Sequence, residues 1–147
     1  MRAVVQRVRT ATVKVGGDIV GSCQAGLVIL LGVAASDGEA DADRLAARIA
    51  RLRIFENAEG RFDLSLLDVA GEALVVSQFT LIADSRRQKG TRPDFSGAAP
   101  REQAEPLYEG FIEALRGEGV PVETGVFGAR MAVELVNDGP VTIILET

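Results

Sequence analysis

The apolar run at residues 26–33, GLVILLGV, constrains the fold of this chain more than any other segment. Its large aliphatic side chains follow one another without polar alternation, and glycines stand near both of its ends. A run this short is typical of a strand buried on both faces of a sheet rather than of a buried helix. We therefore predict that residues 26–33 form a central strand, with other elements covering both of its faces.

The residues before this run predict a hairpin. In the second half of residues 2–15, apolar side chains alternate with polar ones, which is the period of a half-buried strand. Gly16-Gly17-Asp18 then marks a tight turn, and Ile19 and Val20 continue as the partner strand. A further short strand is predicted at residues 73–76.

Residues 40–53 have the pattern of an amphipathic helix, with apolar side chains at helical spacing and arginines on the other faces. Ser36 and Glu39 have the spacing of a capping box, in which two side chains satisfy backbone N–H groups at the start of a helix. The apolar positions are Ala42, Leu45, Ile49 and Leu52.

A second helix is predicted at residues 102–116, after a long segment at 84–100 that is rich in Arg, Gly, Pro and Ser and is typical of a loop. Pro106 fits best in the first turn of a helix, so we expect the helix to begin near Glu105. Strands are expected at three later segments, residues 121–124, 131–136 and 141–145.

The order strands, helix, strand, loop, helix, strands is that of an α+β fold with a mixed, mainly antiparallel sheet and two main helices. The length of 147 residues is that of one domain, and no segment has the composition of an interdomain linker. We therefore expect residues 1–147 to form a single domain.

The composition excludes several kinds of active site. The chain has no histidine, so it can form neither a Ser-His-Asp triad, nor a Cys-His pair, nor an imidazole metal site. It has one cysteine, so it cannot form an internal disulfide or a thiolate cluster. A net charge of −5 argues against a protein that coats nucleic acid through charge alone.

The sequence also lacks the signals of a cofactor or membrane protein. It contains neither a Walker A segment nor Gly-x-Gly-x-x-Gly, and its aspartates do not have the spacing of a calcium loop. No apolar run approaches the roughly 20 residues that span a bilayer. Arginines interrupt the first residues, where a signal peptide needs an apolar stretch. We expect a cytoplasmic protein with no metal, cofactor or membrane contact.

The segment Ser77-Gln78-Phe79-Thr80 directly follows a predicted strand and is the first candidate for a site. Two hydroxyls, an amide and the backbone N–H groups at a strand end can bind a polar ligand. The same side chains can instead cap the local backbone, and composition alone favours that role. A Ser or Thr nucleophile needs a base, and no Ser-x-x-Lys pattern supplies one.

Three other segments have both a functional and a structural interpretation. A cis bond at Gly139-Pro140 would redirect two carbonyls, whereas a trans bond would make an ordinary hairpin turn. Phe127 and Met131 can pack against a nucleobase, a partner subunit or the core. Four cations gather in the long loop, where they can hold phosphates or simply be solvated. They are Arg86, Arg87, Lys89 and Arg92.

Together these segments resemble one family, the D-aminoacyl-tRNA deacylases, also called D-tyrosyl-tRNA deacylases. The resemblance covers essentially the whole chain and rests mainly on two separated segments, VVSQFTL at 75–81 and NDGPVT at 137–142. Further similar segments are MRAVVQRV at 1–8, LRIF at 52–55, RPDFSGAAP at 92–100 and FGA at 127–129. The resemblance implies a barrel-like α+β core.

The function that the resemblance implies is editing. Such an enzyme hydrolyses the ester of D-aminoacyl-tRNA, and also of mischarged glycyl-tRNA, and rejects L-aminoacyl-tRNA sterically. Gly139 and Pro140 would form a cis bond, enter the site of a second subunit and leave no space for an L side chain. Arg7 would hold this turn in its orientation. The implied assembly is therefore a homodimer.

The resemblance also assigns Ser77, Gln78, Phe79 and Thr80 to the pocket for the terminal adenosine and the ester. The backbone N–H of Phe79 would stabilise the oxyanion, and the tRNA 2′-hydroxyl would assist catalysis in place of a protein base. Two alternatives remain: a hydrolase with Thr80 as nucleophile, and a module that binds an RNA 3′ end without turnover. Contacts to the tRNA are expected at Arg86, Arg87, Lys89, Arg92 and Met131.

Overall fold

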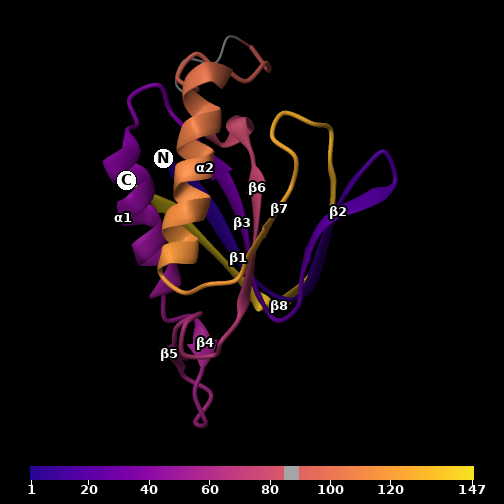
Figure 1. Ribbon diagram of the computed structural model, residues 1–147, viewed down its shortest axis with the longest axis vertical. Helices are drawn as coiled ribbons and strands as arrows, with labels where there is room; N and C mark the ends of the chain where they lie inside the picture. Colours follow the sequence, from indigo (N-terminus) through magenta and orange to yellow (C-terminus); the bar gives the residue numbers. More distant parts are fainter. Residues whose placement is uncertain (85–89) are drawn as a thin grey trace.

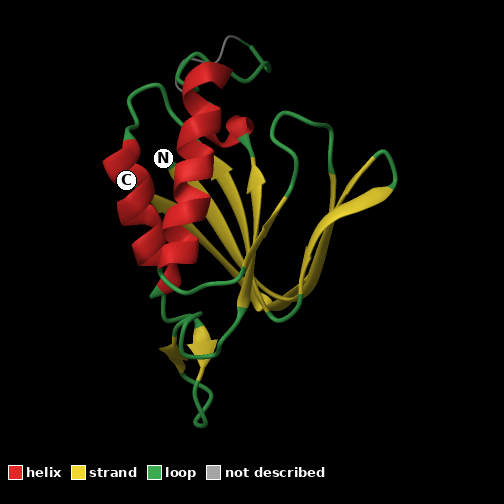
Figure 2. Cartoon of the chain, in the orientation of Figure 1, coloured by secondary structure: helices red, strands yellow, loops and turns green. Residues whose placement is uncertain are grey.

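The computed structural model describes residues 1–84 and 90–147. A curled sheet is covered on one face by two helices that lie side by side (Figure 1, Figure 2). The elements in chain order are β1 (Arg2–Val15), β2 (Asp18–Cys23), β3 (Gly26–Gly32), α1 (Glu39–Ala50), β4 (Phe55–Glu56), β5 (Phe62–Leu64), β6 (Glu72–Ser77), the 3-10 helix η1 (Phe79–Ile82), α2 (Arg101–Gly117), β7 (Val122–Thr124) and β8 (Ala132–Glu146).

β1 organises the sheet because it is long enough to pair with three strands. Its first half pairs with β3, its second half pairs with β2, and β8 runs antiparallel along its other edge. β6 joins β3 and β7 joins β6 in parallel. The sheet curls until β2 and β7 meet, where Glu123 accepts a 2.7 Å hydrogen bond from the N–H of Ser22. This nearly closed barrel with two helices confirms the predicted α+β class.

β3 is the central strand that the apolar run predicts. Its odd-numbered side chains, from Leu27 to Leu31, join a core with the buried faces of α1 and α2. Val28 joins a second core inside the barrel. Every residue of the strand except Leu30 is buried. The prediction of a strand covered on both faces is therefore confirmed.

The start of α1 is capped differently from the prediction. Gly38 precedes the helix, and the carboxylate of Asp41 accepts a 2.9 Å hydrogen bond from its N–H, so the predicted pairing of Ser36 with Glu39 is wrong. Asp41 takes the role because the helix begins at Glu39, which makes Gly38 the N-cap residue and Asp41 the residue three positions after it. The hydrogen bond from Gly38 also lowers the pKa of the Asp41 carboxyl below its usual value. The helix ends at Ala50, three residues short of its predicted end.

α2 begins at Arg101, before the predicted start near Glu105, and Pro106 lies inside it. Leu107 and Tyr108 are buried against the core, and this packing outweighs the one backbone hydrogen bond that Pro106 cannot donate. Pro106 itself is exposed, so its ring meets solvent rather than a neighbouring element. No helix in the described residues is long and apolar enough to cross a membrane.

Candidate active site

The end of β6 turns directly into η1, and this junction carries the first predicted segment. The N–H of Gln78 donates to the carbonyl of Leu31 at 2.8 Å, which ties the junction to β3. The first N–H that bonds back within the turn is that of Leu81, to the Gln78 carbonyl at 3.2 Å. The N–H groups of Phe79 and Thr80 therefore have no acceptor within the turn.

Two residues of neighbouring strands fix the position of η1. A Cβ at Gly32 would stand 2.9 Å from the carbonyl oxygen of Gln78 and 3.1 Å from the Cβ of Leu81, so β3 approaches η1 where a side chain is missing. Nη1 of Arg2 donates to the Leu81 carbonyl at 2.5 Å. The junction after β6 is thus held from two sides by the sheet.

A cavity of about 420 Å³ opens beside this junction. Its floor comes from the ends of β3 and β6, one wall comes from the start of α2, and the opposite wall comes from the residues that lead into β8. The described residues that line it are Leu31, Val33, Val76, Ser77, Gln78, Phe79, Ala99, Arg101, Ala104, Tyr108, Phe127, Gly128, Ala129, Met131 and Val133.

Aromatic rings stand on both sides of the cavity. Tyr108 and Phe127 pack with ring centroids 5.5 Å apart, and the guanidinium of Arg101 lies 5.7 Å from the centre of the Phe127 ring. On the other side, Phe79 is 59% exposed and meets the edge of Phe95 at 5.1 Å. Such rings offer flat apolar faces on which a nucleobase can stack.

The ionisable side chains among the described lining residues are Arg101 and Tyr108. Tyr108 is buried and donates its hydroxyl proton to the Val75 carbonyl at 2.9 Å. Burial raises the pKa of this hydroxyl well above its usual value. An arginine stays protonated at physiological pH, so neither side chain is suited to act as a general base.

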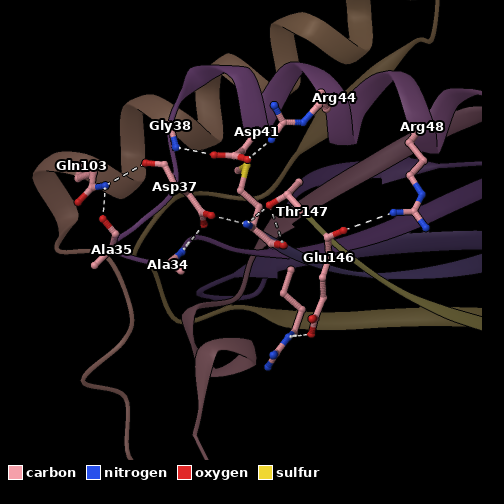
Figure 3. Close-up of polar contacts among 12 residues, drawn as sticks. Ala34, Ala35, Asp37, Gly38, Asp41, Arg44, Arg48, Gln103, Glu146 and Thr147 are labelled. Carbon is pink, nitrogen blue, oxygen red and sulfur yellow. Dashed lines mark hydrogen bonds and ion pairs between the residues drawn. The ribbon is translucent and has the colours of Figure 1, made fainter.

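A polar cluster joins the turn at residues 34–37 to the N-terminus and to α2 (Figure 3). The Asp37 carboxylate accepts hydrogen bonds from the Met1 ammonium at 2.5 Å and from the Ala34 N–H at 2.6 Å. The side-chain amide of Gln103 donates to two carbonyls of the same turn, including that of Asp37 at 3.2 Å. The same turn also pairs with residues 97–99. The N–H of Ala99 donates to the Val33 carbonyl, and Ala34 forms an antiparallel β-bridge with Ala98.

Gly139-Pro140, called here the Gly-Pro motif, lies in a bulge of β8 and not in the predicted hairpin turn. Both flanking segments belong to β8 and pair with β1, so the two strands predicted there are one strand. Between the pairs Gln6–Thr142 and Val8–Asn137, four residues of β8 lie opposite Arg7 alone. The peptide bond between Gly139 and Pro140 is cis.

Side chains on both strands hold this bulge. Asn137 accepts a 2.7 Å hydrogen bond from the Val141 N–H and donates to the Val141 carbonyl at 3.1 Å, which closes the loop like a backbone pair. Nε of Arg7 donates to the Asp138 carbonyl at 2.9 Å, and Arg9 pairs with the Asp138 carboxylate at 3.0 Å. Gly139 has a φ of 143°, and a Cβ there would stand 2.7 Å from a methyl carbon of Val141. Only glycine fits this position without a shift.

Neither residue of the Gly-Pro motif is among the described residues that line the cavity. Val133 lines the cavity and pairs with Val13, whereas the motif lies opposite Arg7, six residues earlier along β1. Six residues of strand place the motif roughly 20 Å from Val133. Gly139 and Pro140 are both exposed.

The structure thus divides the predicted site residues into two groups. Ser77, Gln78, Phe79 and Met131 line the cavity, while Arg7, Gly139 and Pro140 form the bulge on β8. Thr80 is exposed outside the lining, and its hydroxyl accepts a hydrogen bond from the Gln78 amide. Arg92 is exposed. The predicted tRNA contacts at Arg86, Arg87 and Lys89 lie outside the described residues.

Sequence reasoning missed Tyr108 and Arg101 as parts of the cavity wall. Tyr108 is the one tyrosine of the chain and has an apolar neighbour on the same helix face, so its sequence pattern is that of a core residue. Arg101 precedes the predicted start of α2, and no sequence pattern indicates a role for it in a site. Within residues 1–84 and 90–147, no cluster of three or more Cys, Asp and Glu side chains could hold a metal ion.

The fold is that of a small α+β protein, a curled mixed sheet under two helices. Its cavity at a strand end offers aromatic rings and backbone N–H groups, and its described lining has no side-chain base. The sequence profile of the family described as D-Tyr-tRNA(Tyr) deacylase matches residues 4–146. The chain belongs to this deacylase family, and the protein is a hydrolase.

Relatives that are also named as deacylases align along the entire chain. Proteins named D-aminoacyl-tRNA deacylase are 58% identical in Chloroflexus aurantiacus, 60% in Roseiflexus sp. and 56% in Thermus aquaticus. Each alignment covers 100% of this chain and 91%, 94% and 95% of the respective relative.

Two solved structures share the fold. The one titled c-Myc DNA Unwinding Element Binding Protein has a TM-score of 0.91 and 42% identity, over 100% of this chain and 99% of that chain. A probable eukaryotic D-amino acid tRNA deacylase has a TM-score of 0.83 over 98% and 97% of the two chains. Its 17% identity makes it a match of fold alone.

Proposed function

We propose that the protein hydrolyses the ester that joins a D-amino acid to the 3′ end of tRNA. One observation carries the proposal: Ser77, Gln78 and Phe79 meet an aromatic wall in one cavity, in a chain 56–60% identical to proteins named D-aminoacyl-tRNA deacylase. In this reaction water adds to the ester carbonyl carbon and the bond to the ribose 3′-oxygen breaks. Free tRNA and the D-amino acid are the products.

The terminal adenosine of the tRNA is the part of the substrate that suits the cavity. Its base can stack on the exposed ring of Phe79 or against Phe127, and Met131 offers a polarisable apolar contact beside them. A single 3′ end needs few charge contacts, so a chain with a net charge of −5 can still bind it. Further contacts to the backbone of the tRNA are proposed at Arg92 and at Arg86, Arg87 and Lys89.

The chemistry requires an oxyanion donor and a path for the proton. The N–H of Phe79, which has no acceptor within η1, is the proposed donor to the carbonyl oxygen as negative charge develops on it. Neither Arg101 nor Tyr108 is a suitable base, and the chain has no histidine. We therefore assign the proton transfer to the 2′-hydroxyl that neighbours the ester on the tRNA itself.

Selection of the D configuration is assigned to the Gly-Pro motif of a second subunit. The motif is exposed and is not among the described residues that line the cavity of its own chain, so it is free to meet the cavity of a partner. There the carbonyls of Gly139 and Pro140 would face the substrate amino group and exclude an L side chain. Glycine has no side chain to exclude, so glycyl-tRNA is a further proposed substrate. The proposed location of the homodimer is the cytoplasm, where charged tRNA is used.

The direct test offers D-Tyr-tRNA and L-Tyr-tRNA to the purified protein in parallel and measures release of the amino acid. We expect the D ester to be hydrolysed at least a hundredfold faster in kcat/KM, which corresponds to about 2.7 kcal/mol of discrimination. Uncatalysed hydrolysis without protein is the control. Equal hydrolysis of both esters, or of neither, would rule out the proposed function.

A second candidate function is binding of a nucleic acid end without turnover. It is favoured by the likeness to the solved structure titled as a DNA unwinding element binding protein. In that case a pulldown would retain D-Tyr-tRNA with its ester intact after prolonged incubation. Loss of the ester on the time scale of the binding experiment excludes this candidate.

A further inference from the structure

The guanidinium of Arg7 links the residue before the Gly-Pro motif to the β4–β5 hairpin and to the residue before that hairpin. Its side chain is 7% exposed. Nε donates to the Asp138 carbonyl at 2.9 Å, and Nη1 donates to the Ile54 carbonyl at 2.7 Å, just before β4. A movement of this guanidinium would therefore move the carbonyl that precedes Gly139.

Two side chains of the hairpin complete the surroundings of Arg7. Oε1 of Glu56, in β4, accepts a 3.4 Å hydrogen bond from Nη2 of Arg7. The Phe62 ring, in β5, has its centre 5.4 Å from Cζ of Arg7, which is within the range of a cation–π contact. Nη2 is also the nitrogen that lies against Gly139, since a Cβ built on Gly139 would stand 3.3 Å from it.

The hairpin is itself firmly tied to the chain around it. Nε of Arg53 donates to the Asp63 carbonyl at 2.7 Å, and the two side chains form an ion pair. The side-chain oxygen of Asn57 accepts hydrogen bonds from two N–H groups of the intervening turn, including that of Arg61 at 3.0 Å. The hairpin can therefore serve as a fixed support for Arg7.

We propose that Glu56 and Phe62 are positioning residues for the choice between D and L substrates, acting through Arg7 on the Gly-Pro motif. This inference rests on the proposed function and extends the site to the β4–β5 hairpin. Glu56 draws Nη2 to one side of Gly139, and the Phe62 ring covers the guanidinium plane. Together they fix the direction of the Asp138 carbonyl, and with it the surface that an L side chain would meet.

The exposure of Phe62 makes it the residue to change. Its ring is 53% exposed, so replacing it removes little core packing. Phe62→Ala deletes the ring over Arg7, whereas Phe62→Tyr keeps it. Val69→Ala is the matched control, because Val69 is another exposed apolar residue, at 37%, that follows β5 in the chain and makes no described polar or ring contact with Arg7.

The experiment measures kcat/KM of each variant on D-Tyr-tRNA and on L-Tyr-tRNA. For Phe62→Ala we expect the ratio of the D value to the L value to fall about two- to fivefold, the range of a partly exposed cation–π contact. The L value should rise, because the excluding surface is no longer fixed. Phe62→Tyr and Val69→Ala should keep the wild-type ratio, and Glu56→Gln should lower it about twofold.

The outcomes separate this inference from the proposed function. A wild-type protein that does not prefer the D ester overturns the proposed function and the inference together. A wild-type protein that prefers it, with an unchanged ratio in both Phe62→Ala and Glu56→Gln, overturns the inference alone. A parallel fall of the D and L values, together with a lower melting temperature, indicates a purely structural role and also overturns it.

Discussion

At the scale of single residues, burial removes reactivity from the side chains that could otherwise replace the missing histidine. Cys23 is 2% exposed and belongs to the core inside the barrel, as expected of a small hydrophobic residue. Burial raises the pKa of its thiol to about 11. Tyr108 is buried and its hydroxyl is bonded to a backbone carbonyl. Neither side chain can easily lose its proton near neutral pH, so neither can take the place of a histidine base.

The Cys23 thiol should react slowly with thiol reagents in the folded protein. At pH 8 a group with a pKa of about 11 is thiolate in roughly one molecule in a thousand, so labelling should be slow and should quicken about tenfold per pH unit up to pH 10. A disulfide reagent monitored by absorbance gives the rate. Unfolding in urea should make labelling rapid at pH 8, and rapid labelling before unfolding would contradict the burial of Cys23.

Thr80→Ala should leave most of the deacylase activity. Thr80 is exposed outside the cavity lining, and its described side-chain partner is the Gln78 amide, which is not a base. We expect kcat/KM on D-Tyr-tRNA within about threefold of the wild type, with Thr10→Ala as an exposed threonine control. A loss of several orders of magnitude would instead support Thr80 as the nucleophile.

At the scale of elements, glycines decide where strands and loops can approach one another. Gly26 begins β3 in direct contact with the backbone of Glu72 in β6, so a side chain there would overlap the neighbouring strand. Gly32 at the other end leaves room for η1 beside the cavity. Gly110, in contrast, lies in α2 with open space around the position of a Cβ.

The same substitution at two glycines should therefore change stability in opposite directions. Gly110→Ala should raise the free energy of unfolding by about 0.5–1 kcal/mol, because alanine restricts the unfolded chain and favours the helix. Gly26→Ala should lower it by about 1–3 kcal/mol, because β3 and β6 must move apart. Urea unfolding of both variants tests this, and a loss of stability in both would show that α2 does not tolerate the methyl group.

Asp37→Asn should weaken the polar cluster that joins the turn at residues 34–37 to the N-terminus. The Asp37 side chain is 8% exposed and forms the direct ion pair with the buried Met1 ammonium, so its loss leaves that charge with the Thr147 hydroxyl and the more distant Asp41 carboxylate. We expect the free energy of unfolding to fall by about 3 kcal/mol in urea. Asp43→Asn, at an exposed position of α1, should change it by less than about 0.5 kcal/mol. Similar values for the two variants would argue against the ion pair as a support.

At the scale of the whole molecule, β8 offers a long edge to a partner. β8 pairs with β1 along one edge, and no described strand pairs along its other edge. Val133, Val136 and Ile144 are exposed on this strand, at 37%, 52% and 64%. An edge that is long and apolar favours association with another chain. The Gly-Pro motif lies on the same strand, so association along β8 would carry it towards a partner.

Disruption of this edge should abolish activity without unfolding the chain. Val136→Lys places a charge on the exposed edge near the Gly-Pro motif and should convert the proposed homodimer to monomers with at least tenfold lower kcat/KM on D-Tyr-tRNA. Ile19→Lys, at a 61% exposed position on β2, should keep the dimer and the activity. Sedimentation velocity gives the assembly, and specific activity of the wild type should also fall on dilution. Full activity of a monomeric Val136→Lys would contradict a shared site.

Sequence predictions that depend on local signals were correct, whereas those that depend on contacts between distant parts of the chain were wrong. The central strand, the first hairpin and the two helices were predictable because periodicity and turn residues are local signals. The capping pair at Ser36 and the start of α2 were wrong, since Asp41 and the core contacts of Leu107 decide them. Residues 137–140 lie in a bulge and not in a hairpin turn, because the segments on both sides of them pair with β1. No local sequence pattern reveals this pairing.

The sequence by itself determined the fold class, the absence of a histidine base and the two segments, 77–80 and 137–142, that mark the family. Only the tertiary structure decided that these segments lie apart, one at a cavity after β6 and the other on a bulge held by Arg7. It also brought Tyr108 and Phe127 into the cavity and set Phe62 over Arg7. The physical reason is that residue types limit the available chemistry, whereas distances depend on the register and curvature of strands far apart in sequence.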